Sequence, residues 1–405
     1  MYSLYLDLNG TILLCMILLF VCDALLRIPL YSIIARMGKR HDKSGLMLDT
    51  PPISVIILSR GDADELRRLL TRVFEQSYPA FEVVVVDDGR NPEVAEMIKK
   101  WEVNDKHLRL TFTPDNMRTI VRRKLSLTLG VRAARHDWVV VTQSDCMPTS
   151  ADWLRAFATH IRENTDIVLG YANYHTDHYE DVPLHIVYDR MRFNMQAFLS
   201  ASRNHPIAGD YTNMAFRKSM FLENDGFKGS LYLTGGEGIT LVGEMADRQN
   251  TEVACEEGIK VEQKYESADE SAAERYAQLE ALQHSSGMAR MYYYRNGLMA
   301  WTNILLLLVC VLYIIVRAIK IVSMGAYHTE DLQFDIIALA VILTKPILYA
   351  HYFNQSAALV KAPTMTFSLP FLELLIPLRT LIYKNRRERY EERFEATEEN
   401  FTANN

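Results

Sequence analysis

The run WVVVTQSDCMP at residues 138–148 constrains the fold more than any other segment of the chain. A stretch of β-branched residues that stops abruptly at a carboxylate is typical of a buried parallel strand with Asp145 at its C-terminal end. In an open α/β sheet, ligands bind at that end of the strands. An earlier run, FEVVVVDDG (81–89), ends in Asp87 and Asp88. We therefore expect two acidic strand ends to converge on one crevice.

Strands and helices alternate in the part of the chain that contains these two runs. The patterns predict a strand, a loop and an amphipathic helix over 53–79, a strand at 81–89, a helix at 92–104, a strand at 108–113, a helix at 124–137 and the central strand at 138–142. This order is typical of βαβ units. The sequence thus predicts an α/β fold with a doubly wound, mostly parallel sheet, flanked by transmembrane helices.

Apolar runs near both ends indicate that the chain is also a membrane protein. The chain has 405 residues, of which 49% are hydrophobic, so we expect one soluble domain plus membrane segments. Residues 11–36 are long enough to cross a bilayer core of about 30 Å. Lys39, Arg40 and Lys43 follow them, which predicts a cytoplasmic location for that end. A signal peptide is disfavoured, because the run has no basic segment before it and no small-residue cleavage site after it.

Charged residues inside the apolar runs need partners. Asp23 and Arg27 stand one helical turn apart in the first run, where pairing would reduce the cost of insertion. We interpret them as a structural pair and not as an ion path. Near the other end, the stretch 367–383 is short, carries Glu373 and Arg379 and is interrupted by prolines. This favours an interfacial or re-entrant element over a full span.

The resulting domain division places the soluble domain and the C-terminal tail on the cytoplasmic side. The predicted regions are 1–50 as anchor and linker, 51–265 as the soluble domain, 266–297 as an amphipathic interfacial region, 298–383 as a membrane region with spans at 298–323 and 335–353, and 384–405 as a charged tail.

Composition excludes several classes of function. A net charge of −6 leaves no basic stripe for a phosphate backbone, so we expect no nucleic-acid partner. The five cysteines form no C-x-x-C pair, which supports neither a disulfide framework nor a zinc site. No G-x-G-x-x-G follows the first strand, which disfavours a domain that binds NAD.

Six blocks occur in a specific order between residues 51 and 265. They are SVIILSRGD, FEVVVVDDG, KLSLTLGVRAA, TQSDCMPTSADWL, GDYTNMAFRKSMF and GGEG followed by LVGEMADRQN. In this order they resemble the family-2 glycosyltransferases, inverting enzymes with a GT-A fold, and the membrane-flanked layout is similar to bacterial members. The resemblance implies transfer of a sugar from a UDP- or GDP-sugar to a lipid-linked or cell-surface glycan acceptor, in cell-envelope polysaccharide biosynthesis. It also implies a location in the bacterial inner membrane, with membrane lipids as partners.

The resemblance assigns nucleotide contacts to the ends of the first two strands. Ser59, Arg60, Asp62 and Asp88 stand there, with Arg60 and Asp62 in the place of the family's R-N-E element. Alternatively, Asp62 only caps the helix that follows it. Lys124 matches a family lysine that faces the nucleotide, and the alternative for it is a solvated helix lysine.

A divalent cation, Mg²⁺ or Mn²⁺, is the family's usual means of offsetting charge on the leaving diphosphate. Asp145 matches the last acid of the family's D-x-D motif and is the residue expected to bind the metal. The first acid is replaced by Gln143, which supplies no charge but is suited to a hydrogen bond with ribose or sugar. We therefore expect weaker metal binding than at a site with two carboxylates.

The family's general base is an acid at the start of a late helix. Here that element reads GGEG, and the position of the base appears as Gly238. Glu237 either takes the base role or only favours the helix N-terminus. Asp210 and Asn213 match a segment that borders sugar and acceptor, and the alternative for Asn213 is a backbone contact in a turn.

Processive relatives carry Q-x-x-R-W on an interfacial helix, and the corresponding helix at 274–284 has no Arg-Trp pair. This disfavours polymer synthesis. The competing hypothesis is a catalytically weakened relative that binds a nucleotide sugar or a partner transferase. We favour the enzyme, because Asp88, Asp145 and the Gly-Asp-Tyr-Thr-Asn segment remain.

Overall fold

The structure is a computed structural model of the chain. It describes residues 2–37, 50–87, 92–104, 107–113, 119–175, 182–285, 287–324 and 331–388.

A seven-stranded sheet organises the soluble domain, in the order β3-β2-β1-β4-β8-β6-β9. Its strands are β1 (Ile53–Leu58), β2 (Phe81–Asp87), β3 (Leu108–Phe112), β4 (Trp138–Gln143), β6 (Ile167–Leu169), β8 (Met214–Arg217) and β9 (Thr251–Val253). All pairs are parallel except those that β8 makes with β4 and β6. The predicted mostly parallel α/β fold is thus confirmed, with one antiparallel strand that the sequence pattern did not reveal.

A smaller sheet packs beside the C-terminal end of β4, in the order β5-β10-β7. Its strands are β5 (Cys146–Pro148), β7 (Ala172–Tyr174) and β10 (Val261–Gln263). Because β5 begins directly after Asp145, and β10 pairs with it, this sheet brings the segment near residue 263 to the end of the central strand.

Helices cover the large sheet and form the walls around its strand ends. They are α2 (Ala63–Phe74), α3 (Pro92–Asn104), α4 (Thr119–Ala133), α5 (Trp153–Thr159), α6 (Leu184–Ser202), α7 (Lys218–Glu223), α8 (Glu237–Met245) and α9 (Ala268–His284), with short 3₁₀ turns at Lys228–Ser230 and Glu257–Ile259. The apolar spacing of Leu66, Leu69 and Val73 makes α2 amphipathic and buries that face. Gly130 lets α4 approach the sheet closely, because a Cβ there would lie 2.6 Å from Ile56 Cγ2.

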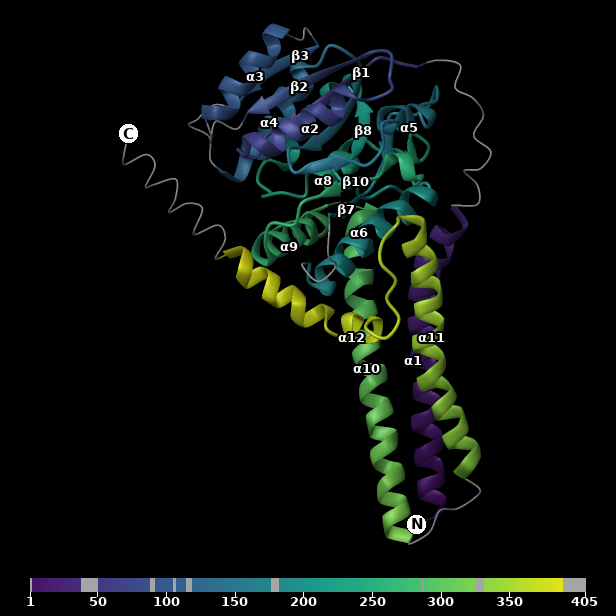
Figure 1. The fold of residues 1–405 in the computed structure, drawn as a ribbon. Coiled ribbons are helices and arrows are strands. Elements are labelled where there is room, and N and C mark those ends of the chain that lie inside the picture. Colours follow the sequence, from purple (N-terminus) through teal and green to yellow (C-terminus); the bar gives the residue numbers. More distant parts are fainter. Residues whose placement is uncertain are drawn as a thin grey trace, which may run out of the picture.

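Three long helices extend away from the α/β domain, with the N-terminus at their far end (Figure 1). They are α1 (Tyr2–Met37), α10 (Gly287–Met324) and α11 (Leu332–Leu359), and α1 packs against both others. Each is long and apolar enough to cross a membrane, over Leu8–Pro29, Gly287–Ser323 and Leu332–Leu359. The middle one begins before the predicted span at 298–323, because 287–297 continue the same helix without a break.

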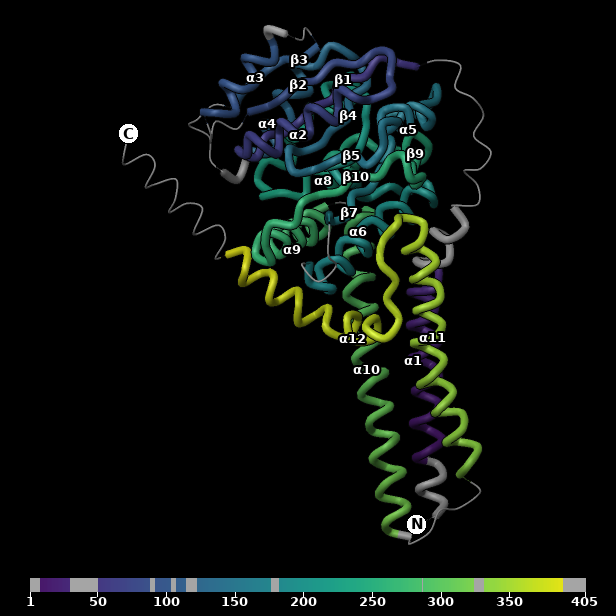
Figure 2. The backbone as a smooth tube through the Cα atoms, viewed as in Figure 1, coloured from purple at the N-terminus to yellow at the C-terminus, as the bar shows by residue number. Residues whose placement is uncertain are grey.

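The chain after α11 turns back along the lower side of the α/β domain (Figure 2). Helix α12 (Leu369–Leu374) is followed by helical residues 376–388. The latter segment exposes Leu378 and Leu381 on one side. On the other side, Arg379 and Tyr383 bind the carboxylate of Asp189 on α6. This short, two-sided element lies in the stretch for which the sequence predicts an interfacial or re-entrant segment.

Candidate active site

The candidate site lies where the central strands of the large sheet end. Leu58 at the end of β1 pairs with Gln143 at the end of β4 and with Val86 on β2. Asp145 follows β4 and is buried at this edge, as is Asp87 at the end of β2. Asp87 and Asp145 thus lie at the same edge of the sheet, with β1 between their strands, and their convergence on one crevice stays a prediction. Asp88 lies outside the described residues.

Three side chains hold the carboxylate of Asp145, and one of them is Cys146, whose Sγ donates to Oδ1 at 3.4 Å. Arg60 Nη1 donates to Asp145 Oδ2 at 2.8 Å, and Gln263 Nε2 donates to the same oxygen at 3.0 Å. The backbone N–H of Arg60 also donates to Ser144 Oγ at 3.0 Å. The loop after β1 and the turn after β4 are thereby joined at the base of the crevice, and Asp145 is neutralised by a guanidinium.

Arg60 has a second carboxylate partner, Glu270 on α9. Burial lowers the pKa of the arginine, but Asp145 and Glu270 outweigh it and raise the pKa above its ordinary value. Arg60 nevertheless stays partly accessible, with 26% of its side chain exposed. Ser59, which precedes it, is buried and accepts a hydrogen bond from the Gly61 N–H at 3.2 Å.

A divalent cation does not fit the donor set at Asp145 as the chain folds. The Asp145 side chain has no exposed surface; its Oδ2 atom accepts from Arg60 and Gln263, and its Oδ1 atom accepts from Cys146 Sγ. Within the described part of the chain, no group of three His, Cys, Asp or Glu side chains is placed to hold a metal ion. Gln143 is buried beside this point, and its Oε1 atom has no hydrogen-bond partner among the described residues. One neutralised carboxylate and one amide oxygen lack the charge that such an ion requires.

Two side chains that the sequence predicts at the nucleotide form hydrogen bonds within the fold. Asp62 caps α2, because its Oδ1 atom accepts from the backbone N–H groups of Asp64 and Glu65. Lys124 is fully buried and donates to the carbonyl oxygens of Ser230 and Leu233. Burial lowers the pKa of this lysine. The structure therefore places Lys124 against the loop before α8, and it is not a solvated helix lysine.

Glu237 is the first residue of α8 and is buried. Glu237 is 1% exposed, lies 3.6 Å from Arg123 Nη1, and its Oε2 atom has no hydrogen-bond partner among the described residues. Positive φ angles at Gly235 and Gly236 give the chain the turn that starts this helix. Glu237 thus combines the helix N-terminus with a carboxylate oxygen that lies in an ion pair with Arg123.

Close packing against the segment that contains Gly209 and Tyr211 requires a glycine at position 238. A Cβ at this position would overlap the Gly209 carbonyl oxygen and lie 2.7 Å from its carbon and 3.0 Å from the Tyr211 nitrogen. The Gly209 N–H also donates to the Gly238 carbonyl oxygen at 3.1 Å. An aspartate at position 238 therefore has no room, for a steric reason and not because of a positive φ angle.

The two predicted acceptor residues differ in what they bind. Asn213 is fully used by the fold, because its Oδ1 accepts from Trp153 Nε1 and its Nδ2 donates to the Tyr171 and Ile259 carbonyl oxygens. Asp210 accepts from Thr212 through Oδ1. Its other oxygen lies 2.8 Å from Arg190 Nη2, which makes it part of the charge cluster in the crevice.

Sequence reasoning missed that α9 contributes charge to this site. Besides Glu270, the helix places Glu274 Oε1 3.8 Å from Arg190 Nη1, and this oxygen has no hydrogen-bond partner in the described part of the chain. Burial raises the pKa of Glu274, opposed by Arg190 and Arg123. The signal in the sequence is two acids one helical turn apart, Glu270 and Glu274, in the predicted interfacial region 266–297.

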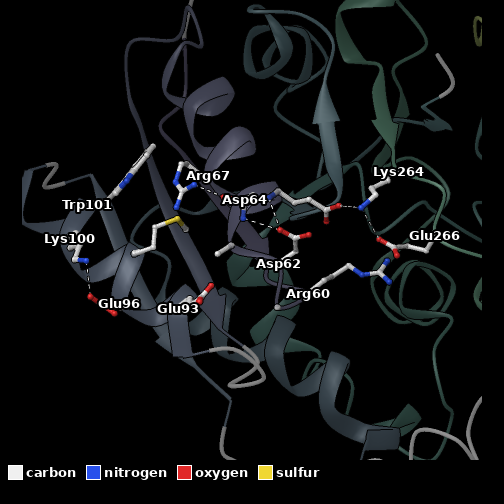
Figure 3. Close-up of a pocket in the computed structure, with 14 residues that line it drawn as sticks. Arg60, Asp62, Asp64, Arg67, Glu93, Glu96, Lys100, Trp101, Lys264 and Glu266 are labelled. Carbon is white, nitrogen blue, oxygen red and sulfur yellow. Dashed lines mark hydrogen bonds and ion pairs between the residues drawn. The ribbon is translucent and has the colours of Figure 1, made fainter.

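A cavity of about 850 Å³ opens beside Arg60, between α2 and α3. In Figure 3, Arg60, Asp62, Lys264 and Glu266 lie on one side of it and Trp101 on the other. Its volume is in the range of small-molecule sites. Its wall holds Asp62, Asp64, Glu65, Glu93, Glu96 and Glu266 against Arg60, Arg67, Lys100 and Lys264.

The family to which the site belongs follows from its sequence. The sequence model of glycosyl transferase family 2 matches residues 54–224, which include β2, β4 and Asp145. The chain contains a family-2 glycosyltransferase domain. The predicted resemblance and the predicted enzyme class are thus confirmed for this glycosyltransferase.

A solved structure supports the fold. A mannosyltransferase from Pyrobaculum calidifontis, PcManGT, in complex with GDP-Man and Mn²⁺, superposes with a TM-score of 0.52 at 14% identity, over 87% of this chain and 99% of that chain. TarS of S. aureus, residues 1–349, gives a TM-score of 0.40 at 15% identity over 84% of this chain and 91% of that chain. At these identities only the fold is comparable. No curated protein matches the chain in sequence.

Proposed function

We propose that this glycosyltransferase is anchored in a membrane and transfers one sugar, with inversion, from a nucleotide donor to a lipid-linked or cell-surface glycan acceptor. The observation that carries the proposal is the position of the crevice above the membrane helices. Helix α6, which supplies Arg190, packs on α1, and α9, which supplies Glu270 and Glu274, packs on α10 (Figure 1). An acceptor held in the lipid would reach the crevice from this side.

A nucleoside diphosphate sugar is the donor class that the family and the fold favour. PcManGT was solved with GDP-Man and TarS with UDP-GlcNAc, and UDP- and GDP-sugars are the two donors we propose to test. The buried, unpartnered Oε1 of Gln143 supports a role as acceptor for a hydroxyl of the donor. Ser59 and Arg60 remain proposed nucleotide contacts, as does Asp88, which lies outside the described residues.

In an inverting transfer, the acceptor hydroxyl oxygen forms a bond to the anomeric carbon while the bond from that carbon to the phosphate oxygen breaks. The electron pair of the broken bond leaves on the diphosphate, and the hydroxyl proton passes to a base. Glu237 is the base we propose, because it is the first residue of α8, next to Gly238, which packs against Gly209 and Tyr211 on either side of Asp210. Arg123 at 3.6 Å would hold the carboxylate in place.

The decisive assay measures sugar transfer by the purified full chain in detergent, with UDP- and GDP-sugars and lipid-linked acceptors. Glu237→Gln should keep donor affinity and slow transfer by about 10²- to 10⁴-fold, the usual contribution of a positioned base. Glu244→Gln is the matched control, because it makes the same change on the same helix and should leave transfer unchanged. Equal rates for Glu237→Gln and wild type would remove Glu237 from the base role.

A catalytically weakened binding subunit is the second candidate function. It is favoured by the packing at Gly238, which leaves no room for the family's aspartate, and by the salt bridge that neutralises Asp145. Donor binding without transfer, in wild type and in Glu237→Gln alike, would establish this alternative.

The proposed orientation places the α/β domain in the bacterial cytoplasm, at the inner membrane. It is supported by Lys39, Arg40 and Lys43 after the first apolar run. With three spans, the domain and the helical segment 376–388 lie on the same side. A cysteine introduced at Ser323 should react with an impermeant reagent from outside, whereas one at Asn385 should not.

A further inference from the structure

The diphosphate of the proposed donor needs a positive partner, and the structure provides one where the family would place a metal. Asp145 has no exposed side-chain surface and is bound by Arg60 at 2.8 Å. A divalent ion entering here would have to displace this guanidinium from the same carboxylate oxygen. The arginine itself is already in place, charged and partly exposed.

The lining of the large cavity agrees with this assignment. Its carboxylates suit the hydroxyl and N–H donors of a ribose and base, but they repel phosphate. Lys264 on the same wall is already bound by Glu65 and lies 3.7 Å from Glu266. Arg60 is therefore the cation at the inner edge, next to the strand ends, that a diphosphate in this cavity would meet (Figure 3).

Helix α9 supplies the anions that presently occupy the arginines of the crevice. Glu270 binds Arg60, and Glu274 lies 3.8 Å from Arg190. Two carboxylates carry about the same charge as the two phosphates of a nucleotide sugar, each of which holds one negative charge near neutral pH. The exchange of Glu270 for a phosphate would keep the crevice balanced.

We propose that Arg60 replaces the divalent cation in donor binding, with Glu270 as the exchangeable counter-ion that the donor diphosphate displaces. This inference rests on the proposed function, because it concerns the donor of that transfer. The fork of the guanidinium suits two oxygens at once, so one Nη keeps Asp145 while the other binds phosphate. As the bond to the anomeric carbon breaks, the added charge on the leaving phosphate strengthens this hydrogen bond, and the guanidinium keeps its proton.

The experiment is calorimetric binding of UDP and GDP to the full chain in detergent, once with EDTA and once with Mn²⁺. We expect one of the two nucleotides to bind in EDTA with an affinity that Mn²⁺ leaves unchanged within about twofold. Binding that requires Mn²⁺, or no binding of either nucleotide in both buffers, would overturn the proposal.

Three variants distinguish nucleotide binding through Arg60 from nucleotide binding through a metal ion at Asp145. Arg60→Met should weaken nucleotide binding in EDTA by about 10- to 100-fold, the range for lost hydrogen bonds to a charged group. Arg162→Met, an exposed arginine at the far edge of the sheet, is its control. Asp145→Asn should leave binding in EDTA within about threefold of wild type, because the phosphate contact remains with Arg60. A loss of binding in folded Asp145→Asn equal to that in Arg60→Met would contradict the assignment.

Glu270→Gln provides a test that does not depend on an altered arginine. Without its second counter-ion, Arg60 should bind UDP or GDP about 3- to 10-fold more tightly. Asp269→Asn makes the same change in charge at the neighbouring position, where the partner is Arg386, and should have no effect. Unchanged nucleotide affinity in Glu270→Gln would contradict the proposal that the diphosphate displaces Glu270 from Arg60.

Failure of this inference is distinguishable from failure of the proposed function. Metal-free nucleotide binding through Arg60 without sugar transfer would leave the inference standing and remove the transferase. Sugar transfer that requires Mn²⁺ would support the transferase and overturn the inference about Arg60.

Discussion

Two clusters of buried charge, one in the crevice and one among the membrane helices, are built in opposite ways. In the membrane cluster, Asp23 is bound by Arg27 at 2.8 Å, Lys345 at 3.1 Å and Tyr349 at 2.8 Å, and Arg27 also pairs with Glu373 at 2.9 Å. Two acids and two bases thus neutralise each other. The pairing of Asp23 and Arg27 predicted from the sequence is confirmed.

Two ion pairs of the crevice cluster are longer than those of the membrane cluster, because Glu237 Oε2 lies 3.6 Å from Arg123 and Glu274 Oε1 lies 3.8 Å from Arg190. Oxygens of Gln143, Glu237 and Glu274 have no hydrogen-bond partners among the described residues, and Arg60 remains partly exposed. A closed set of ion pairs stabilises an arrangement of helices, whereas an open set keeps binding capacity for a ligand. We therefore expect the charges among the three long apolar helices to serve assembly and the charges of the crevice to serve binding.

Removing one member of the membrane cluster should have the largest effect. Asp23→Ala leaves Arg27 and Lys345 buried without this carboxylate, which should lower the free energy of unfolding by about 3–5 kcal/mol. Thermal or denaturant unfolding in detergent measures it, with the exposed Asp64→Ala as control. A loss below about 1 kcal/mol would mean that the two clusters do not differ in this way.

The backbone is closely packed at Gly238. Gly238→Ala would force its Cβ against the Gly209 carbonyl group, and we expect a loss of about 3 kcal/mol, the upper part of the range for overpacking. Gly243→Ala on the same helix meets no atom within 4 Å, and it should instead raise stability by about 0.5–1 kcal/mol. Equal effects of the two substitutions in an unfolding experiment would contradict the packing at Gly238.

The smallest expected effect concerns Glu274 and pH. Burial raises the pKa of this carboxyl in the folded chain above its ordinary value of 4.5. The stability that it contributes is therefore full below that value and is lost as pH rises through the folded pKa. Glu274→Gln removes this loss, so the stability of the variant relative to wild type should be greater at pH 8 than at pH 4.5.

Unfolding at several pH values measures this difference, with Glu223→Gln, an exposed residue on α7, as control. A stability difference between Glu274→Gln and wild type that stays constant with pH would place Glu274 with the closed ion pairs of the membrane cluster.

Local pattern alone located the strand ends. Six of the seven elements predicted between 53 and 142 correspond to a strand or helix within a few residues, and the helix predicted at 124–137 begins earlier, at Thr119. The antiparallel β8 escaped prediction because its four residues, Met214–Arg217, are too few for a period to appear. The tie between Arg60 and Glu270 could not be predicted, because 210 residues separate the two.

The sequence by itself determined the parallel sheet, the position of Asp145 at its edge and the three apolar helices, because burial on both faces of a strand and passage through lipid each impose a local pattern. Tertiary structure alone decided which charged side chains form ion pairs at the edge of the sheet. Gly238 is forced by a backbone from another segment, and Arg60 is bound by a carboxylate from α9. Neither contact can be read from the residues that neighbour it in the sequence. The energy of a buried ion pair depends on the distance between the two charged groups and not on the adjacent residues.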